Sequence, residues 1–106
     1  MASSETYLQF ILDQLEGLEG ITSRKMMGEY LLYFQGKVFG GIYDDRFLIK
    51  VTKAGRALLP HCEQELPYPG AKLMFLVEDV DEKAFLQRLV VETSRELPEP
   101  KTKKKS

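Results

Sequence analysis

The most reactive side chains in this sequence are adjacent: His61 and Cys62 are its only histidine and its only cysteine. A cysteine beside a base can act as a nucleophile, and a Cys-His pair can also ligate a metal. Neighbouring residues of an extended loop point in different directions, and no second histidine completes either kind of site. We therefore expect an ordinary loop pair, and an enzyme built on Cys62 and His61 is the least favoured functional hypothesis.

Two groups of carboxylates could in principle bind a metal or transfer protons. Asp44-Asp45 separates two apolar segments, where aspartate is typical of tight turns because it tolerates left-handed backbone geometry. The other group precedes an amphipathic segment, where carboxylates complement the helix dipole, and comprises Glu78, Asp79, Asp81 and Glu82. Asp79 and Glu82 have the spacing of a capping box. Both groups are therefore predicted to be structural, and no metal, cofactor or catalytic residue is expected.

Basic residues near the predicted strands are candidates for contacts with nucleic acid: Arg24, Lys25, Arg46, Lys50 and Lys53. They could form one edge of a sheet with interleaved tyrosines (Tyr30, Tyr33 and Tyr43), a combination that suits single-stranded nucleic acid. The favoured alternative is a solvated edge whose lysines prevent unwanted strand pairing. A net charge of −1 also argues mildly against DNA as the main partner. Weak nucleic-acid binding, helped by the lysine-rich C-terminus, is therefore the alternative function.

Residues 26–51 organise the rest of the chain and are predicted to form three antiparallel strands. In the first strand, alternation places Tyr30, Leu32 and Phe34 on one face, and Leu31 and Tyr33 on the other. The predicted turns are Gln35-Gly36 and Asp44-Asp45, and the pair Gly40-Gly41 indicates a bulge or a close backbone approach. Since both faces are apolar, one covers a core and the other is partly covered or meets a partner.

Helices are predicted before and after these strands in the sequence. Residues 4–18 show an amphipathic stripe with Ser3 or Ser4 as N-cap, and Thr52 caps a short helix over residues 53–59. Residues 21–25 read as a connector. Residues 60–72 read as a proline-bearing loop that can hold a turn of helix near residues 62–65 or a short strand. Residues 73–77 read as a further strand. The acidic group at residues 79–82 is predicted to open the last helix, which frays before Pro98.

This order predicts an α+β domain with two layers: an antiparallel sheet of four or five strands with helices mainly on one face. The order is helix, three strands, short helix, one or two strands, helix. The length of 106 residues and the hydrophobic fraction of 43% suit one domain, expected over residues 1–97. Residues 98–106 contain no large apolar residue and are expected to form a disordered lysine-rich tail.

The sequence shows no feature that directs it to a membrane. No apolar run reaches the roughly 18 residues typical of a membrane span. The N-terminus lacks the basic and apolar regions of a signal peptide. A cytoplasmic location is therefore expected, without a membrane partner.

Several segments in residues 8–90 together resemble the N-terminal domain of the TfoX/Sxy family. The resembling segments are Arg24-Lys25-Met26-Met27-Gly28, the aromatic strand through Tyr33, Gly36-Lys37, Phe39, Asp44-Asp45, Leu48-Ile49-Lys50, Tyr68-Pro69 and Leu73-Met74. This chain departs from the family pattern at Gly28-Glu29, where the family has two glycines, and at Gln35-Gly36, where it has Asp-Gly. We expect no counterpart of the C-terminal domain of the full-length competence regulators, so a transcriptional coactivator role is not favoured.

The resemblance implies a small α+β domain similar to secretion-chaperone-like folds, with no established enzymatic activity. The full-length proteins of this family are tied to the regulation of DNA-uptake genes. We therefore expect a non-catalytic regulatory or protein-interaction domain, with another protein or a second copy as the partner. The contact surface is expected on the open sheet face or its edge, and the candidate residues are Leu31, Tyr33, Phe39 and Tyr43.

Overall fold

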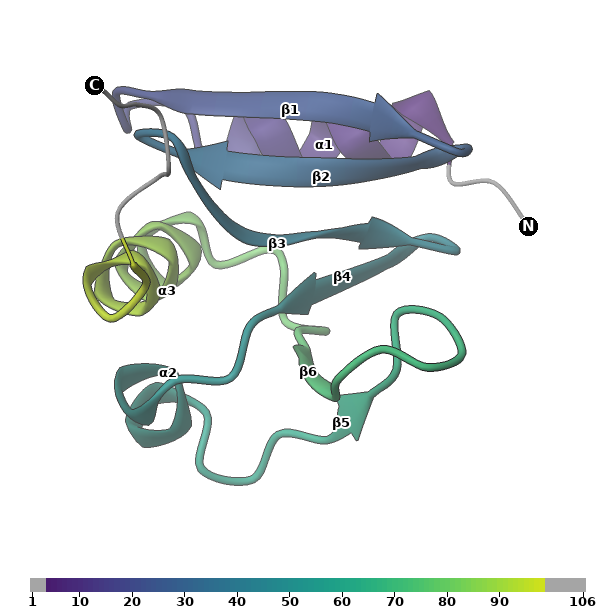
Figure 1. Ribbon diagram of the computed structural model, residues 1–106. Helices are drawn as coiled ribbons and strands as arrows, with labels where there is room; N and C mark the ends of the chain where they lie inside the picture. Colours follow the sequence, from purple (N-terminus) through teal and green to yellow (C-terminus); the bar gives the residue numbers. More distant parts are fainter. Residues whose placement is uncertain (1–3, 99–106) are drawn as a thin grey trace, which may run out of the picture.

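The computed structural model describes residues 4–98, which form three helices and one six-stranded sheet (Figure 1). The elements follow in the order α1 (Glu5–Gln14), β1 (Ile21–Met26), β2 (Glu29–Phe34), β3 (Lys37–Tyr43), β4 (Arg46–Ile49), α2 (Lys53–Leu58), β5 (Gln64–Glu65), β6 (Met74–Leu76) and α3 (Lys83–Arg95). The predicted α+β class is confirmed, and so is the order of helices around the strands.

All neighbouring strands of the sheet are antiparallel, and the strand order is β1-β2-β3-β4-β6-β5. The prediction of four or five strands was too low. The additional strand is β1, whose residues were expected to form a connector because they show no apolar alternation. An edge strand is held by main-chain hydrogen bonds to one neighbour and needs no buried face, so its polar sequence gave no signal.

Two-residue turns join the first four strands. Both central residues have positive φ in each turn: Met27 and Gly28 at 54° and 86°, Gln35 and Gly36 at 51° and 85°, and Asp44 and Asp45 at 54° and 56°. Two positive φ values identify type I′ turns, whose twist matches that of the strands they connect. The second and third turns were predicted, whereas the first turn became visible only with β1.

A bulge interrupts the pairing of β2 with β3. Tyr33 pairs with Val38 and Leu32 pairs with Gly40, so Phe39 is the extra residue on β3. The glycine pair predicted a bulge, and the structure places it directly before that pair. The extra residue turns Phe39 toward the helices, where its side chain is 0% exposed.

The helices cover one face of the sheet, called here the inner face, as predicted (Figure 1). The fully buried contributors from the sheet are Leu32, Phe39, Ile42, Phe47 and Ile49. They pack against Ile11 and Leu15 near α1 and against α3. Leu58 and Leu59 add part of the α2 region to the same core.

The capping predictions had different outcomes. The Ser4 hydroxyl accepts a hydrogen bond from the backbone N–H of Tyr7 at 3.2 Å, and the Thr52 hydroxyl accepts one from Gly55 at 3.0 Å. Both predicted caps are therefore confirmed. The predicted start of the last helix was wrong, because α3 begins at Lys83 and Glu82 at its N-cap makes no side-chain capping bond. The capping box favours a serine or threonine at its first position, which Asp79 does not supply.

Most of the predicted tail, residues 99–106, lies outside the described residues. Within residues 4–98, none of the helices combines the length and the apolar character needed to cross a membrane.

Candidate interaction groove on the open sheet face

The face of the sheet opposite the helices carries a second, smaller apolar cluster. Tyr43, Leu48 and Met74 are buried there, with Leu31 and Leu76 packed against them. Instead of a helix, the loop of residues 66–73 between β5 and β6 reaches toward this face, and Pro67 of the loop is buried. We call this face the outer face, and the loop forms one of its walls.

Arg46 fastens the loop to the sheet. Its guanidinium forms an ion pair with Glu65 at 2.8 Å and donates hydrogen bonds to the carbonyl oxygens of Leu66 and Pro67 at 3.1 and 3.4 Å. The Tyr68 ring lies 6.2 Å from the Tyr43 ring, measured between centroids. The loop is therefore held by directed contacts as well as by packing.

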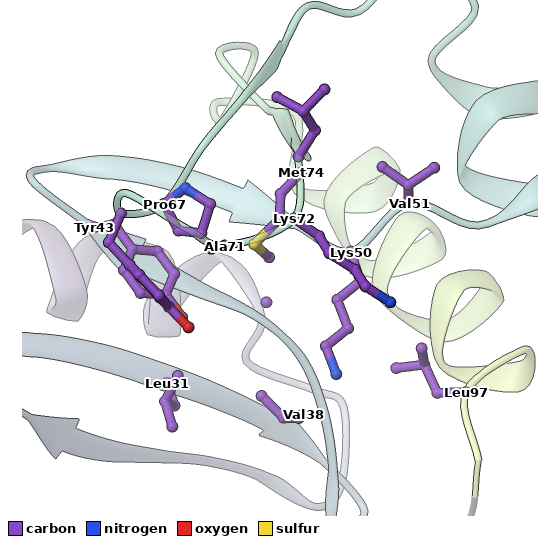
Figure 2. A pocket seen from close by; sticks show the side chains of 13 residues that line it. Leu31, Val38, Tyr43, Lys50, Val51, Pro67, Ala71, Lys72, Met74 and Leu97 are labelled. Atoms are coloured by element: carbon purple, nitrogen blue, oxygen red, sulfur yellow. The ribbon is translucent and has the colours of Figure 1, made fainter.

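A groove runs between this loop and the exposed sides of β2 and β3, and it consists of two adjoining hollows. The lysine pocket has a volume of about 490 Å³ (Figure 2) and is lined by Leu31, Val38, Gly40, Tyr43, Lys50, Val51, Pro67, Tyr68, Ala71, Lys72, Leu73, Met74 and Leu97. The methionine hollow has a volume of about 620 Å³ and is lined by Met26, Met27, Glu29, Leu31, Tyr43, Pro67 and Tyr68. Leu31, Tyr43, Pro67 and Tyr68 line both hollows, which together form the outer groove.

Exposed apolar side chains gather along the outer groove. Seven large hydrophobic residues are exposed among those described, and five of them line it: Met26, Met27, Val51, Tyr68 and Leu73. The most exposed is Met27, at 96% on the first turn. Single exposed apolar residues are normal in folded proteins, whereas a contiguous group around a concavity is typical of a binding surface.

The lysine pocket is also electropositive. Burial lowers the pKa of Lys50, and repulsion from Lys72 lowers that pKa further. Figure 2 shows both lysine side chains among those that line the hollow. None of the described residues that line it is acidic. At the junction of the two hollows, burial raises the pKa of Tyr43, with smaller contributions from Tyr68, Glu29 and Tyr33.

The predicted interaction residues have different environments in the structure. Leu31 and Tyr43 line the outer groove, and Tyr33 is partly buried but lines neither hollow. Phe39 belongs to the inner core, because the bulge moves it to the other face. Sequence reasoning missed most of the groove lining, including Tyr68, Lys72 and Leu73. The available signal was a set of apolar residues inside a loop rich in proline.

The five basic residues do not gather at one edge of the sheet. Arg24 and Lys25 lie exposed on the edge strand β1, whereas Arg46 lies on the interior strand β4 and holds the loop. Lys50 lines the lysine pocket, and Lys53 begins α2. Of the interleaved tyrosines, Tyr30 is buried in the inner core. These residues therefore share no common surface, and nucleic-acid binding stays a prediction.

His61 and Cys62 do not form a dyad. His61 is exposed and has no hydrogen bond to Cys62 among the described contacts. The Cys62 thiol donates instead to the carbonyl oxygen of Leu76, with a sulfur–oxygen distance of 3.0 Å. Burial raises the pKa of Cys62, and nearby Glu78 and Glu63 contribute in the same direction. A raised pKa leaves less thiolate at neutral pH, which is the opposite of nucleophile activation.

The aspartates of the third turn make structural contacts. An Asp45 carboxylate oxygen accepts a hydrogen bond from the backbone N–H of Ser4 at 2.8 Å, which ties the turn to the start of α1. The backbone N–H of Asp44 donates to the Glu29 carboxylate at 3.1 Å. Within residues 4–98, no three potential ligands among His, Cys, Asp and Glu come together to hold a metal ion.

Comparison with known proteins places this architecture in a family. The family model of the TfoX N-terminal domain matches residues 13–92, which is most of the chain. This chain belongs to the TfoX N-terminal domain family. An uncharacterized 12.7 kDa protein in the trpE 5′ region of Spirochaeta aurantia is 40% identical over 105 residues, covering 98% of this chain and 91% of that protein.

The TfoX N-terminal domain family is not a known enzyme family. Its matched range contains every residue that lines the outer groove except Leu97. Apart from Leu97, the groove lining therefore falls within the matched TfoX N-terminal domain.

Proposed function

We propose that this chain is a non-catalytic interaction domain that binds a partner protein, or a second copy of itself, through the outer groove. The observation that carries the proposal is the gathering of exposed apolar side chains around one concavity. A regulatory role, of the kind associated with competence regulators of the TfoX family, would act through this contact.

The shape and rigidity of the groove support a binding role. Loop residues form one wall and strand residues form the floor, so the surface exists before a partner arrives. The contacts of Arg46 fix the loop backbone at Leu66 and Pro67. A preformed surface avoids the entropic cost of ordering a flexible segment on binding.

The test places a photoreactive amino acid at position 73 on the rim of the groove. A matched control places it at position 10, because Phe10 is an exposed apolar residue that lines no part of the groove. After irradiation in cells, we expect covalent adducts from position 73, either with a discrete partner or with a second copy, and none from position 10. Analytical ultracentrifugation of the purified chain then separates self-association from binding to another protein.

A second substitution makes the crosslinking result specific to the groove. Tyr68 is 58% exposed, so Tyr68→Ser removes apolar surface and the ring contact with Tyr43, while the Arg46 contacts that hold the loop stay in place. In that variant the adducts from position 73 should decrease strongly. The proposal is refuted if both positions give the same adducts, or if Tyr68→Ser leaves those from position 73 unchanged.

A further inference from the structure

The lysine pocket contains two cations, Lys50 and Lys72, that no carboxylate among residues 4–98 neutralises. Lys50 follows β4 and is partly buried, while Lys72 enters the same pocket from the loop before β6. Among the described residues, neither ammonium group forms an ion pair or a hydrogen bond. The remaining lining is largely apolar and contains no carboxylate.

This arrangement is unfavourable while the pocket contains only solvent. Partial burial removes water from the Lys50 ammonium, and the second cation repels it. Charged groups that leave water are ordinarily paired with an opposite charge. An anion between the two ammonium groups would compensate both effects, so the pocket is electrostatically complementary to a negative group.

The walls restrict which kind of anion fits. Leu31, Val38, Val51, Met74 and Leu97 surround the lysines with hydrocarbon. A small, strongly hydrated anion such as phosphate would make no apolar contact with these side chains. The volume of about 490 Å³ lies within the usual range for small-molecule sites, roughly 300–1,000 Å³. The pocket therefore fits a ligand with an apolar body and one anionic end.

We propose that the lysine pocket binds an amphipathic organic monocarboxylate, with its carboxylate between Lys50 and Lys72. The apolar body lies along Leu31 and Tyr43, in the direction of the methionine hollow, which shares these residues. This proposal concerns a small-molecule site and does not depend on the proposed protein contact.

The first experiment titrates the full chain with decanoate, below the concentration at which decanoate forms micelles. Binding is followed by chemical shifts of backbone amides and by calorimetry. Decanol supplies the same apolar body without charge, and acetate supplies the charge without the body. We expect saturable shifts at pocket residues with decanoate, and affinities about tenfold or more weaker for both controls.

Lysine variants then test the position of the carboxylate. Lys72→Met should weaken decanoate binding without affecting the fold, because Lys72 is exposed. Lys50→Met should weaken it further, whereas the matched control Lys53→Met should not, because exposed Lys53 lies outside the pocket. In every variant the binding of decanol should change little.

Three results would overturn the proposal. One is equal affinity for decanoate and decanol, which would show that charge plays no part. Another is undiminished decanoate binding in the Lys50→Met, Lys72→Met double variant. The third is a pattern of amide shifts centred outside the lysine pocket.

Discussion

The two faces of the sheet have similar apolar side chains but different coverings. On the inner face, Leu32, Phe39 and Phe47 are 0% exposed because helices close over them. On the outer face, Leu31 and Tyr43 lie beside a loop that covers only part of the sheet. The covering element therefore determines whether an apolar strand face becomes a core or a binding surface. Each prediction below tests this contrast, beginning with the largest expected effect.

The largest effect is expected for Phe39→Ala, which empties a site in the inner core. The free energy of unfolding should fall by about 3–5 kcal/mol, since the cavity lies among side chains without access to water. Urea unfolding measures this change. Tyr33→Ala is the control, because Tyr33 is only partly buried. Equal losses in the two variants would mean that the faces do not differ as described.

The next effect concerns the wall of the outer groove. Arg46→Met removes the ion pair with Glu65 and the hydrogen bonds to the loop carbonyls. We expect a loss of about 1.5–3 kcal/mol, the usual range for hydrogen bonds that involve a charged group. Amide hydrogen exchange should accelerate in residues 64–73 and stay unchanged in α3. Arg24→Met, on the exposed edge strand, should change stability by less than about 0.5 kcal/mol.

A smaller effect, of opposite sign, is expected for Lys50→Met. The pKa of Lys50 is lowered in the folded state, so its charged form destabilises the fold at neutral pH. Wild-type stability should rise as the pH increases through the lowered pKa toward the ordinary value of 10.5, and the variant should lack this rise. Urea unfolding at neutral and alkaline pH compares the two. A variant less stable than wild type at neutral pH would contradict the assigned environment of Lys50.

Still smaller changes are expected on the rim of the groove. Leu73 is 51% exposed, so Leu73→Ser should shift the free energy of unfolding by no more than about 0.5 kcal/mol. The same substitution should reduce partner binding if the groove is the contact surface. A large stability loss would instead show that the rim belongs to a closed core, and thermal unfolding distinguishes these outcomes.

The least perturbing test uses Cys62, whose thiol donates to the carbonyl oxygen of Leu76 in β6. Because its pKa is raised, the folded protein holds less thiolate than the unfolded chain at mildly alkaline pH. Alkylation by iodoacetamide should therefore be slower in the folded protein than in urea, and the difference should narrow as the pH rises. Faster alkylation of the folded protein would indicate an activated thiol and would revive the enzyme hypothesis.

Local patterns predicted the centre of the fold. Alternation in β2 and the turn residues at Gln35-Gly36 and Asp44-Asp45 were sufficient to predict β2, β3 and β4 with the turns between them. Each of these signals lies within a few residues of the next. The bulge shows the limit of such reasoning. Without it Phe39 would share a face with Tyr43, as the sequence suggested, and one extra residue reversed its direction.

The outer groove was less predictable than the sheet. Leu31 and Tyr43 followed from strand alternation, but the wall depends on β6, which pairs with β4 on one side and β5 on the other. That long-range pairing brings Tyr68, Lys72 and Leu73 to the outer face. No local pattern in residues 60–72 encodes which strand the loop will approach.

The tight turns between β1 and β4 have a consequence for the order of folding. Strands joined by two residues make contacts of low sequence separation, which form on a timescale of about 1–10 μs in isolated hairpins. The pairing of β4 with β6 must instead close the whole segment between Ile49 and Met74. A newly made chain should therefore assemble its four-stranded meander first, and the groove acquires its wall only when β6 docks.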